Sequence, residues 1–490
     1  MKKIFILLIL FCAWIDILAQ NFDPPLRLEF DMAENKSMNM ELLGRNGLVL
    51  FFQKNTKDDT KWTVCHYDTN FQLLKMRSVP FETKTNVCVI ASDEHFFYAM
   101  LQSDAARTNI ANTYILRYDA QTKKIDVFSF YQAEKGRIMS MSHYGNIFVY
   151  SILNSKSEEQ IYVFNTKSLE HSVLHQDKSN SCEFQDAYID TLFRSLWVVS
   201  KWHESKKQTA VHLTQLDTNG AVLQEFPLET DNKYTLNSCK IIYANDNAMF
   251  LSGNYLNHEE QKQSTKNNNS GVFTIYLKDN YIEQILFFEY ALMENWYAIH
   301  KNLSGSYDMS YFVMQNDSLI ILATDFYMPE YQQYYNNQYA GSGFYSVPIV
   351  ESKLIGYRYQ TACLFTFDRS GKLLYYNPFN YSGLLLKSVR PLFNGYIDEE
   401  TNEMLFLFGY NNKMFSLVYD KTEIVQGIKT LTIASSSRFE SISTAEKSIC
   451  QHWYGNNFIY SAYQRTSKKY GSSSRKNTKY VFGINKLEYR

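Results

Sequence analysis

Short apolar runs recur along the chain at intervals of about 50 residues, separated by polar and turn-forming residues. The runs are rich in β-branched and aromatic side chains, as in 48–52 (Leu-Val-Leu-Phe-Phe) and 147–150 (Ile-Phe-Val-Tyr). Such short runs, bounded by turn residues, are typical of buried β-strands rather than helices. The other runs are 95–98, 196–199, 249–251, 319–322, 404–407 and 458–460. The hydrophobic pattern therefore predicts one repeated unit built from strands.

The segments on either side of these runs repeat as well. A residue pair that tolerates positive φ and closes a tight hairpin stands before many of them. Examples are Asn46-Gly47, Gly145-Asn146 and Gly455-Asn456. A second strand follows each run and often ends in Asp, whose carboxylate can accept hydrogen bonds from the backbone of the next turn. Examples are Asp68, Asp119, Asp217, Asp368 and Asp420. The predicted unit has four strands, a to d, with tight turns between a and b and between c and d.

About eight such units, with four strands in about 50 residues and no helix between them, match the arithmetic of propeller blades. The chain resembles β-propeller proteins over residues 20–490, although it lacks the Trp-Asp and Gly-His signature of WD40 repeats. We expect one all-β domain of about eight four-stranded blades, or seven if one repeat is degenerate. Segment 26–30 looks like a strand d without preceding partners, and 480–485 like a strand c without a strand d. Pairing these two segments would close the ring and remove its exposed edges.

The N-terminus has the pattern of an export signal. Lys2 and Lys3 precede an apolar stretch over residues 4–15, and Ala19 stands before an expected cut at Gln20. We therefore expect a signal peptide over 1–19 and a protein that is periplasmic, at the cell surface or extracellular. No later stretch approaches the roughly 20 apolar residues of a membrane-spanning helix, so any contact with a membrane would be peripheral.

The charge balance and the cysteine spacing argue against nucleic-acid binding and against a metal site. Lys and Arg number 49 against 50 Asp and Glu, so no overall positive field would attract nucleic acid. The six cysteines after residue 19 lack metal-ligand spacing, and no phosphate-binding or dinucleotide-binding motif occurs. We expect no metal and no cofactor. Disulfides and buried free thiols both stay open, with the scattered positions favouring thiols.

Long connections are predicted to gather on one face. Strands alternate in direction within a blade, so the b–c and d–a loops share the face opposite the tight turns. Every long connection is of this second kind: 257–270, 290–305, 329–360 and 465–479. Long structured loops on one side of a rigid scaffold are the usual place for binding and catalysis.

The insertion at 329–360 is the strongest candidate for a binding surface. Tyr rings offer a large contact area at low entropy cost, and the interleaved Asn and Gln side chains adapt their hydrogen bonds. We expect this surface to recognise a protein or a glycan without catalysis; alternatively, the insertion packs over the propeller mouth as a lid. The candidate ligand-binding residues are Tyr331, Tyr334, Tyr335, Tyr339, Phe344, Tyr345, Tyr357, Tyr359 and Trp296.

A glycan-active hydrolase or lyase is the alternative function. Such an enzyme needs two carboxyl groups about 5 Å or about 6.5–9.5 Å apart beside the sugar. The carboxylates and the histidine near the insertion are Glu289, Glu294, His300, Asp325, Glu330 and Glu351. The Ser/Gly-rich basic segment 465–479 could in addition contact anionic glycans or phospholipid headgroups, or be a solvated charged loop.

Overall fold

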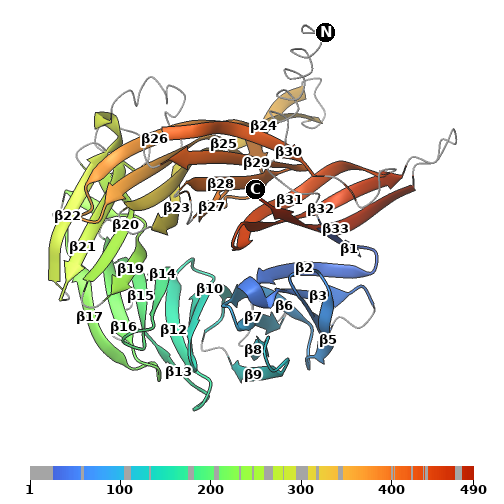
Figure 1. Cartoon of the computed structure of the whole chain (residues 1–490), viewed down its shortest axis with the longest axis horizontal. Coiled ribbons are helices and arrows are strands. Elements are labelled where there is room, and N and C mark those ends of the chain that lie inside the picture. Colours follow the sequence, from blue (N-terminus) through green and yellow to red (C-terminus); the bar gives the residue numbers. More distant parts are fainter. Residues whose placement is uncertain are drawn as a thin grey trace, which may run out of the picture.

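Strands of this chain pair mainly with their neighbours in sequence, and they form a ring of sheets (Figure 1). The computed structural model describes residues 26–56, 60–103, 112–131, 134–174, 181–203, 209–230, 233–245, 248–258, 269–279, 281–293, 307–315, 319–339, 346–398, 401, 403–420, 423–433, 435, 440–468 and 477–489. The predicted signal peptide lies outside these residues. No helix within them is long and apolar enough to cross a membrane.

The first half of the ring contains four antiparallel sheets of four strands each, which we call blades 1 to 4. Blade 1 is β2 (Asn35–Leu42), β3 (Leu48–Lys54), β4 (Lys61–Tyr67) and β5 (Leu73–Pro80), with a 3-10 turn at Gly44–Asn46. Blade 2 is β6 (Thr85–Ser92), β7 (Phe96–Ser103), β8 (Asn112–Asp119) and β9 (Ile125–Tyr131). Blade 3 is β10 (Arg137–Tyr144), β11 (Ile147–Leu153), β12 (Glu159–Asn165) and β13 (Glu170–Val173). Blade 4 is β14 (Cys182–Asp190), β15 (Ser195–His203), β16 (Thr209–Leu216) and β17 (Val222–Leu228).

The second half contains blades 5 to 8. In blade 5, β18 (Tyr234–Leu236) and β19 (Lys240–Asn245) both pair with β20 (Ala248–Asn257), followed by β21 (Gly271–Lys278), β22 (Tyr281–Glu289) and a 3-10 turn at Tyr290–Leu292. Blade 6 is β23 (Tyr307–Gln315), β24 (Leu319–Tyr339), β25 (Ser346–Asp368) and β26 (Leu373–Leu386). Blade 7 is β27 (Asn394–Ile397), β28 (Met404–Tyr410), β29 (Lys413–Asp420) and β30 (Glu423–Thr432). Blade 8 is β31 (Glu440–Tyr454), β32 (Asn457–Lys468), β33 (Asn477–Glu488) and β1 (Leu26–Asp31).

Strand β1 supplies the outer strand of blade 8, as the sequence predicts. It pairs antiparallel with β33 from Leu26 opposite Lys486 to Asp31 opposite Val481. The pairing covers the edge of β33 and makes β1 the outer strand of blade 8, so the two ends of the described chain close one blade together.

A hydrophobic cluster fills each junction between neighbouring blades around the whole ring. Seven clusters join consecutive blades from 1 to 8. The eighth joins blade 8 to blade 1 through Ile459, Phe482 and Trp453 against Leu48 and Leu50. The apolar runs of the sequence are the central strands of the blades, and they supply most of these side chains. The protein is therefore a closed β-propeller of eight blades.

The predicted turns close several blades. Two-residue hairpins connect Tyr144 to Ile147 and Tyr454 to Asn457, with Gly145 and Gly455 at positive φ. The Asp368 carboxylate accepts hydrogen bonds from the backbone N–H of residues 370 and 372. Asp68 and Asp217 accept the equivalent pairs, so the repeated Asp stabilises the c–d turn in each case.

Six cysteines lie in the described residues, and all are free thiols. Five are buried within the blades, and Cys88 is half-buried. The structure thus favours the thiol alternative over disulfides.

Candidate functional site

The Tyr-rich insertion of blade 6 is a β-hairpin rather than an irregular loop. Strands β24 and β25 stay paired from Leu319 opposite Asp368 out to Tyr339 opposite Ser346. The other strands of the blade stop earlier: β23 reaches only Tyr327, and β26 reaches only Tyr357. Beyond that point the hairpin continues as a two-stranded arm, on the face of the ring that carries the b–c connections.

The base of this arm is held by an ion pair across the two strands. The Arg358 guanidinium donates to both carboxylate oxygens of Glu330, at 2.5 and 2.6 Å. This bidentate hydrogen bonding lowers the pKa of Glu330 and raises that of Arg358. Glu330 therefore stays ionised and has a structural partner.

Two of the predicted ligand-binding tyrosines are exposed on the arm. Tyr331 is 57% exposed and lies opposite Leu354, which is itself exposed. Tyr334 is 43% exposed, lies opposite Glu351, and donates its hydroxyl to Gln332 at 2.9 Å. Both rings are accessible from solvent, and ligand binding by them stays a prediction.

Other predicted residues lie in the interior. Tyr359 is fully buried, donates its hydroxyl to the Arg390 carbonyl at 2.6 Å and accepts from the Arg390 N–H at 2.9 Å. Burial raises the pKa of Tyr359. Tyr357 is half-buried and meets the ring of Tyr327 edge to face, at a centroid distance of 6.0 Å. Both tyrosines belong to the core between blades 6 and 7, where they hold the base of the arm.

The remaining candidates are only partly placed. Tyr335 and Tyr339 lie in the paired strands, opposite Val350 and Ser346, and their side chains are outside the described part. Trp296, Phe344 and Tyr345 lie outside the described residues, as do Glu294 and His300.

The described carboxylates near the arm lie on different strands or far apart along one strand. Asp325 is fully buried, accepting from the Tyr381 hydroxyl and from the Leu392 N–H. Glu330 lies five residues further along β24, which is about 17 Å at the rise of a strand. Glu351 is further out on the arm, and Glu289 is in β22 of blade 5. In the described chain no group of three or more His, Cys, Asp and Glu side chains could hold a metal ion.

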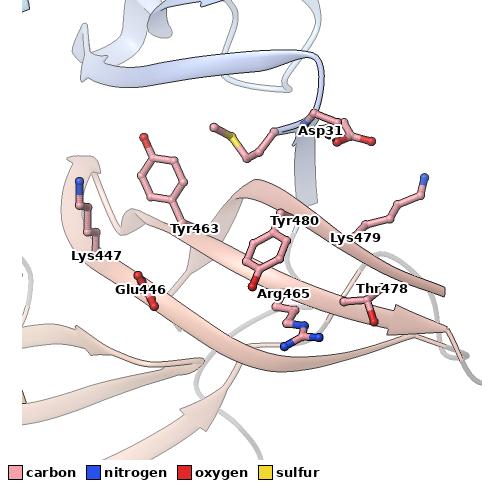
Figure 2. A pocket seen from close by; sticks show the side chains of 10 residues that line it. Asp31, Glu446, Lys447, Tyr463, Arg465, Thr478, Lys479 and Tyr480 are labelled. Atoms are coloured by element: carbon pink, nitrogen blue, oxygen red, sulfur yellow. Dashed lines mark hydrogen bonds between the residues drawn. The ribbon is translucent and has the colours of Figure 1, made fainter. Parts of the chain in front are cut away.

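A pocket lies on the same face of the ring, where blade 8 meets the β1–β2 turn (Figure 2). Its volume is about 740 Å³. The strands around the basic segment 465–479 continue to Lys468 and resume at Asn477, so part of that segment is strand and lines the pocket. The lining residues are Asp31, Met32, Ala33, Glu446, Lys447, Tyr463, Arg465, Thr478, Lys479 and Tyr480.

Cations lie over aromatic rings inside this pocket. The Lys447 ammonium is 5.6 Å from the centre of the Tyr463 ring, and the Arg465 guanidinium is 5.8 Å from that of Tyr480. The Tyr463 hydroxyl donates to the Met38 carbonyl of blade 1 at 3.0 Å, and burial raises its pKa. Tyr463 is thereby fixed between two blades, whereas Tyr480 is 59% exposed.

A β-bulge in β31 places Lys447. Glu446 pairs with Tyr463 and Ile449 pairs with Ser461, so Lys447 and Ser448 stand opposite one residue. Lys447 has a φ of 51°, in the left-handed region that a residue with a Cβ rarely adopts. Bulges of this kind redirect side chains and are frequent next to functional sites.

The sequence does not indicate a polar group on blade 4 that includes His203. Its ring nitrogen Nε2 lies 2.7 Å from the Glu183 carboxylate, and Glu183 pairs across the strands with Lys201. Lys201 contacts the Asn237 carbonyl and side chain in blade 5 at 3.3–3.4 Å, and burial lowers its pKa. These contacts tie blade 4 to blade 5. Only the strand register brings the residues together, so no sequence motif indicates them.

Comparisons with known proteins find only distant likenesses among solved structures. No family model and no curated protein sequence matches this chain. Among solved structures, it is similar to the β-propeller domain of the Trilobed protease from Pyrococcus furiosus (10% identity, TM-score 0.37, 80% of this chain and 95% of that one). It is also similar to the dihydro-heme d1 dehydrogenase NirN (10%, 0.41, 94% and 76%) and to the WD40 domain of SCAP from fission yeast (9%, 0.33, 96% and 98%). At such low similarity these likenesses imply no shared activity.

Proposed function

We propose that this protein is an exported, non-catalytic binding propeller that recognises a protein or a glycan through the face carrying the blade 6 arm. The observation that carries the proposal is the arm itself. It continues twelve residues past Tyr327, the last β24 residue paired with β23, and it presents Tyr331, Tyr334 and Leu354 to solvent. A blade does not need such an extension, because blade 7 joins Tyr410 to Lys413 with a tight turn.

The geometry of the arm favours a partner that covers it. An isolated two-stranded hairpin is marginally stable in water, and within the described residues the arm beyond Tyr327 and Tyr357 has no third strand. Its free strand edges can pair with an extended segment of another protein, and its rings can pack on side chains or on sugar rings. Because Asp325 is buried and Glu330 is paired with Arg358, we favour binding over the hydrolase or lyase alternative.

Shortening the arm tests the proposal. Replacing residues 336–350 with a short Gly/Ser link should leave the melting temperature within a few degrees, since loop length changes stability by only about 0.6 kcal/mol per doubling. The double variant Tyr331→Ser/Tyr334→Ser should likewise stay folded but no longer capture the partner. The partner is first identified with the wild-type protein, by cross-linking on cells or by screening a glycan array. Tyr281→Ser is the matched control, because Tyr281 is 76% exposed on β22 of blade 5.

The outcomes separate the alternatives. Unfolding or aggregation of the shortened protein would show that the arm is a structural lid. Unchanged capture by both variants would place the binding site elsewhere on the ring. Export is tested separately, by fractionating cells that express residues 1–490 and sequencing the N-terminus, which should begin at Gln20.

A further inference from the structure

The pocket at the closure of the ring carries chemistry that the blade 6 arm does not use. We propose that it binds an acidic saccharide, a short oligosaccharide whose sugar rings bear carboxylates. This site is distinct from the arm and does not depend on the function proposed for it.

The pocket has the size and the walls of a ligand site. Its volume of about 740 Å³ falls within the roughly 300–1,000 Å³ of pockets that hold small organic ligands. Strands β31, β32 and β33 form one side, and the turn after β1 forms the other (Figure 2). Because β1 and β33 also close the ring, the backbone around the pocket is fixed by the pairing of blade 8.

The charges suit a ligand of low charge that also carries hydroxyl groups. Three cations (Lys447, Arg465, Lys479) and two carboxylates (Asp31, Glu446) line the pocket, a net charge of +1. The cations can pair with a sugar carboxylate, while the carboxylates accept hydrogen bonds from sugar hydroxyls. The same carboxylates would repel a phosphate dianion or a polyphosphate. Glu446 also meets Lys387 at 3.5 Å, but both groups are exposed and such a pair is weak.

The aromatic residues suit a sugar ring. Tyr480 is largely exposed beside the Arg465 guanidinium, so one cation and one ring can contact the carboxylate and the apolar face of the same sugar. Tyr463 is held by its hydrogen bond to Met38, and its ring lies 5.6 Å from the Lys447 ammonium.

The lysine in the bulge is not required by the backbone. Blade 1 has the same bulge: Lys36 pairs with Gln53, Asn39 pairs with Phe51, and Ser37 has a φ of 54°. A small polar residue therefore satisfies this backbone geometry, and Lys447 brings to blade 8 a charge that the fold does not need.

Binding of uronate trisaccharides to the full-length protein tests the inference. Galacturonate, mannuronate and guluronate trisaccharides are titrated by calorimetry, each beside its methyl ester, which keeps the rings and removes the charge. At least one acid should bind ten times more tightly than its ester, and added salt should weaken it. Lys447→Ser, which copies the bulge of blade 1, and Tyr480→Ala should each weaken binding at least tenfold. The matched control Lys429→Ser, on the exposed outer strand β30, should not.

Three results would overturn the inference. The first is that no uronate binds more tightly than its ester. The second is that Lys429→Ser and Lys447→Ser weaken uronate binding equally. The third is that inorganic phosphate displaces the uronate at equal concentration. The variant with the shortened blade 6 arm should keep its uronate binding, so failure of one proposal is distinguishable from failure of the other.

Discussion

The side chain of Arg27 in β1 holds the closing strand to the rest of blade 8. Its side chain is only 5% exposed. It donates to Asn485 Oδ1 at 3.1 Å, to Gln464 Oε1 at 2.6 Å and to Glu29 Oε1 at 2.6 Å. Asn485 and Gln464 are buried in β33 and β32, so Arg27 connects the N-terminal strand to both. We therefore predict that Arg27→Ala weakens the closure of blade 8.

The size of the effect follows from the acceptors left behind. Each buried amide oxygen without a donor costs about 1–3 kcal/mol, so the pair costs about 2–6 kcal/mol. Unfolding entropy is about 2.1 cal/mol/K per residue, which is about 1 kcal/mol/K for a chain of this length. The melting temperature should then fall by roughly 2–6 °C, if the propeller unfolds as one unit.

Thermal unfolding and limited proteolysis together measure how much the closure of blade 8 is weakened. Arg27→Ala should melt earlier and be cut faster in β1. Lys387→Ala is the control, because the Lys387–Glu446 pair is exposed and such pairs contribute about 0–1 kcal/mol. Gly483→Ala gives a second variant, since a Cβ there would lie 2.7 Å from Arg27 Nη2. If Arg27→Ala and Gly483→Ala melt and resist protease like the wild type, the closure does not rest on this contact.

Three further predictions concern the rest of the ring. Deleting residues 26–32 should lower the melting temperature more than Arg27→Ala does, because the outer strand of blade 8 is lost; cooperative melting at the wild-type temperature would contradict a closed ring. Burial raises the pKa of Glu41, so its ionisation weakens folding as pH rises above the unfolded value of about 4.3; Glu41→Gln should raise the melting temperature at pH 7 and not at pH 4, and the exposed control Glu423→Gln should change neither. Unreduced denatured protein should bind six equivalents of a thiol reagent once the signal peptide is removed, and the native protein at most one, at Cys88; binding only after reduction would show disulfides.

The repeat and the closure could be predicted from the sequence because they depend on local chemistry. The run at 48–52 is β3, and the Asp368 turn forms its hydrogen bonds as the pattern indicates. Closure was predictable because 26–30 and 480–485 each lack a partner that the other supplies.

The sites were less predictable because they depend on register. Segment 329–360 has few turn residues between Glu330 and Tyr339, which indicates that the strand continues. The many Tyr, Asn and Gln residues of the segment suggested a loop instead. The pocket brings together Asp31, Lys447 and Arg465, although Asp31 is far from the other two in the chain. The position of Lys447 depends on a bulge in β31. Neither the bulge nor the pairing register can be read from residue types alone.

The closing strand also imposes an order on folding. Arg27 and Asn485 are 458 residues apart in sequence, so at about 5–20 residues per second the first strand waits roughly half a minute to a minute and a half for its partner to be synthesised. During that time blade 8 does not exist, and blade 1 lacks its neighbour on one side. A chain that ends before β33 keeps an unpaired strand at each side of the gap, and such edges pair with other chains. The pairing of β1 with β33 forms only after both strands have been synthesised, and a ribosome that stalls before β33 should yield aggregates rather than a smaller propeller.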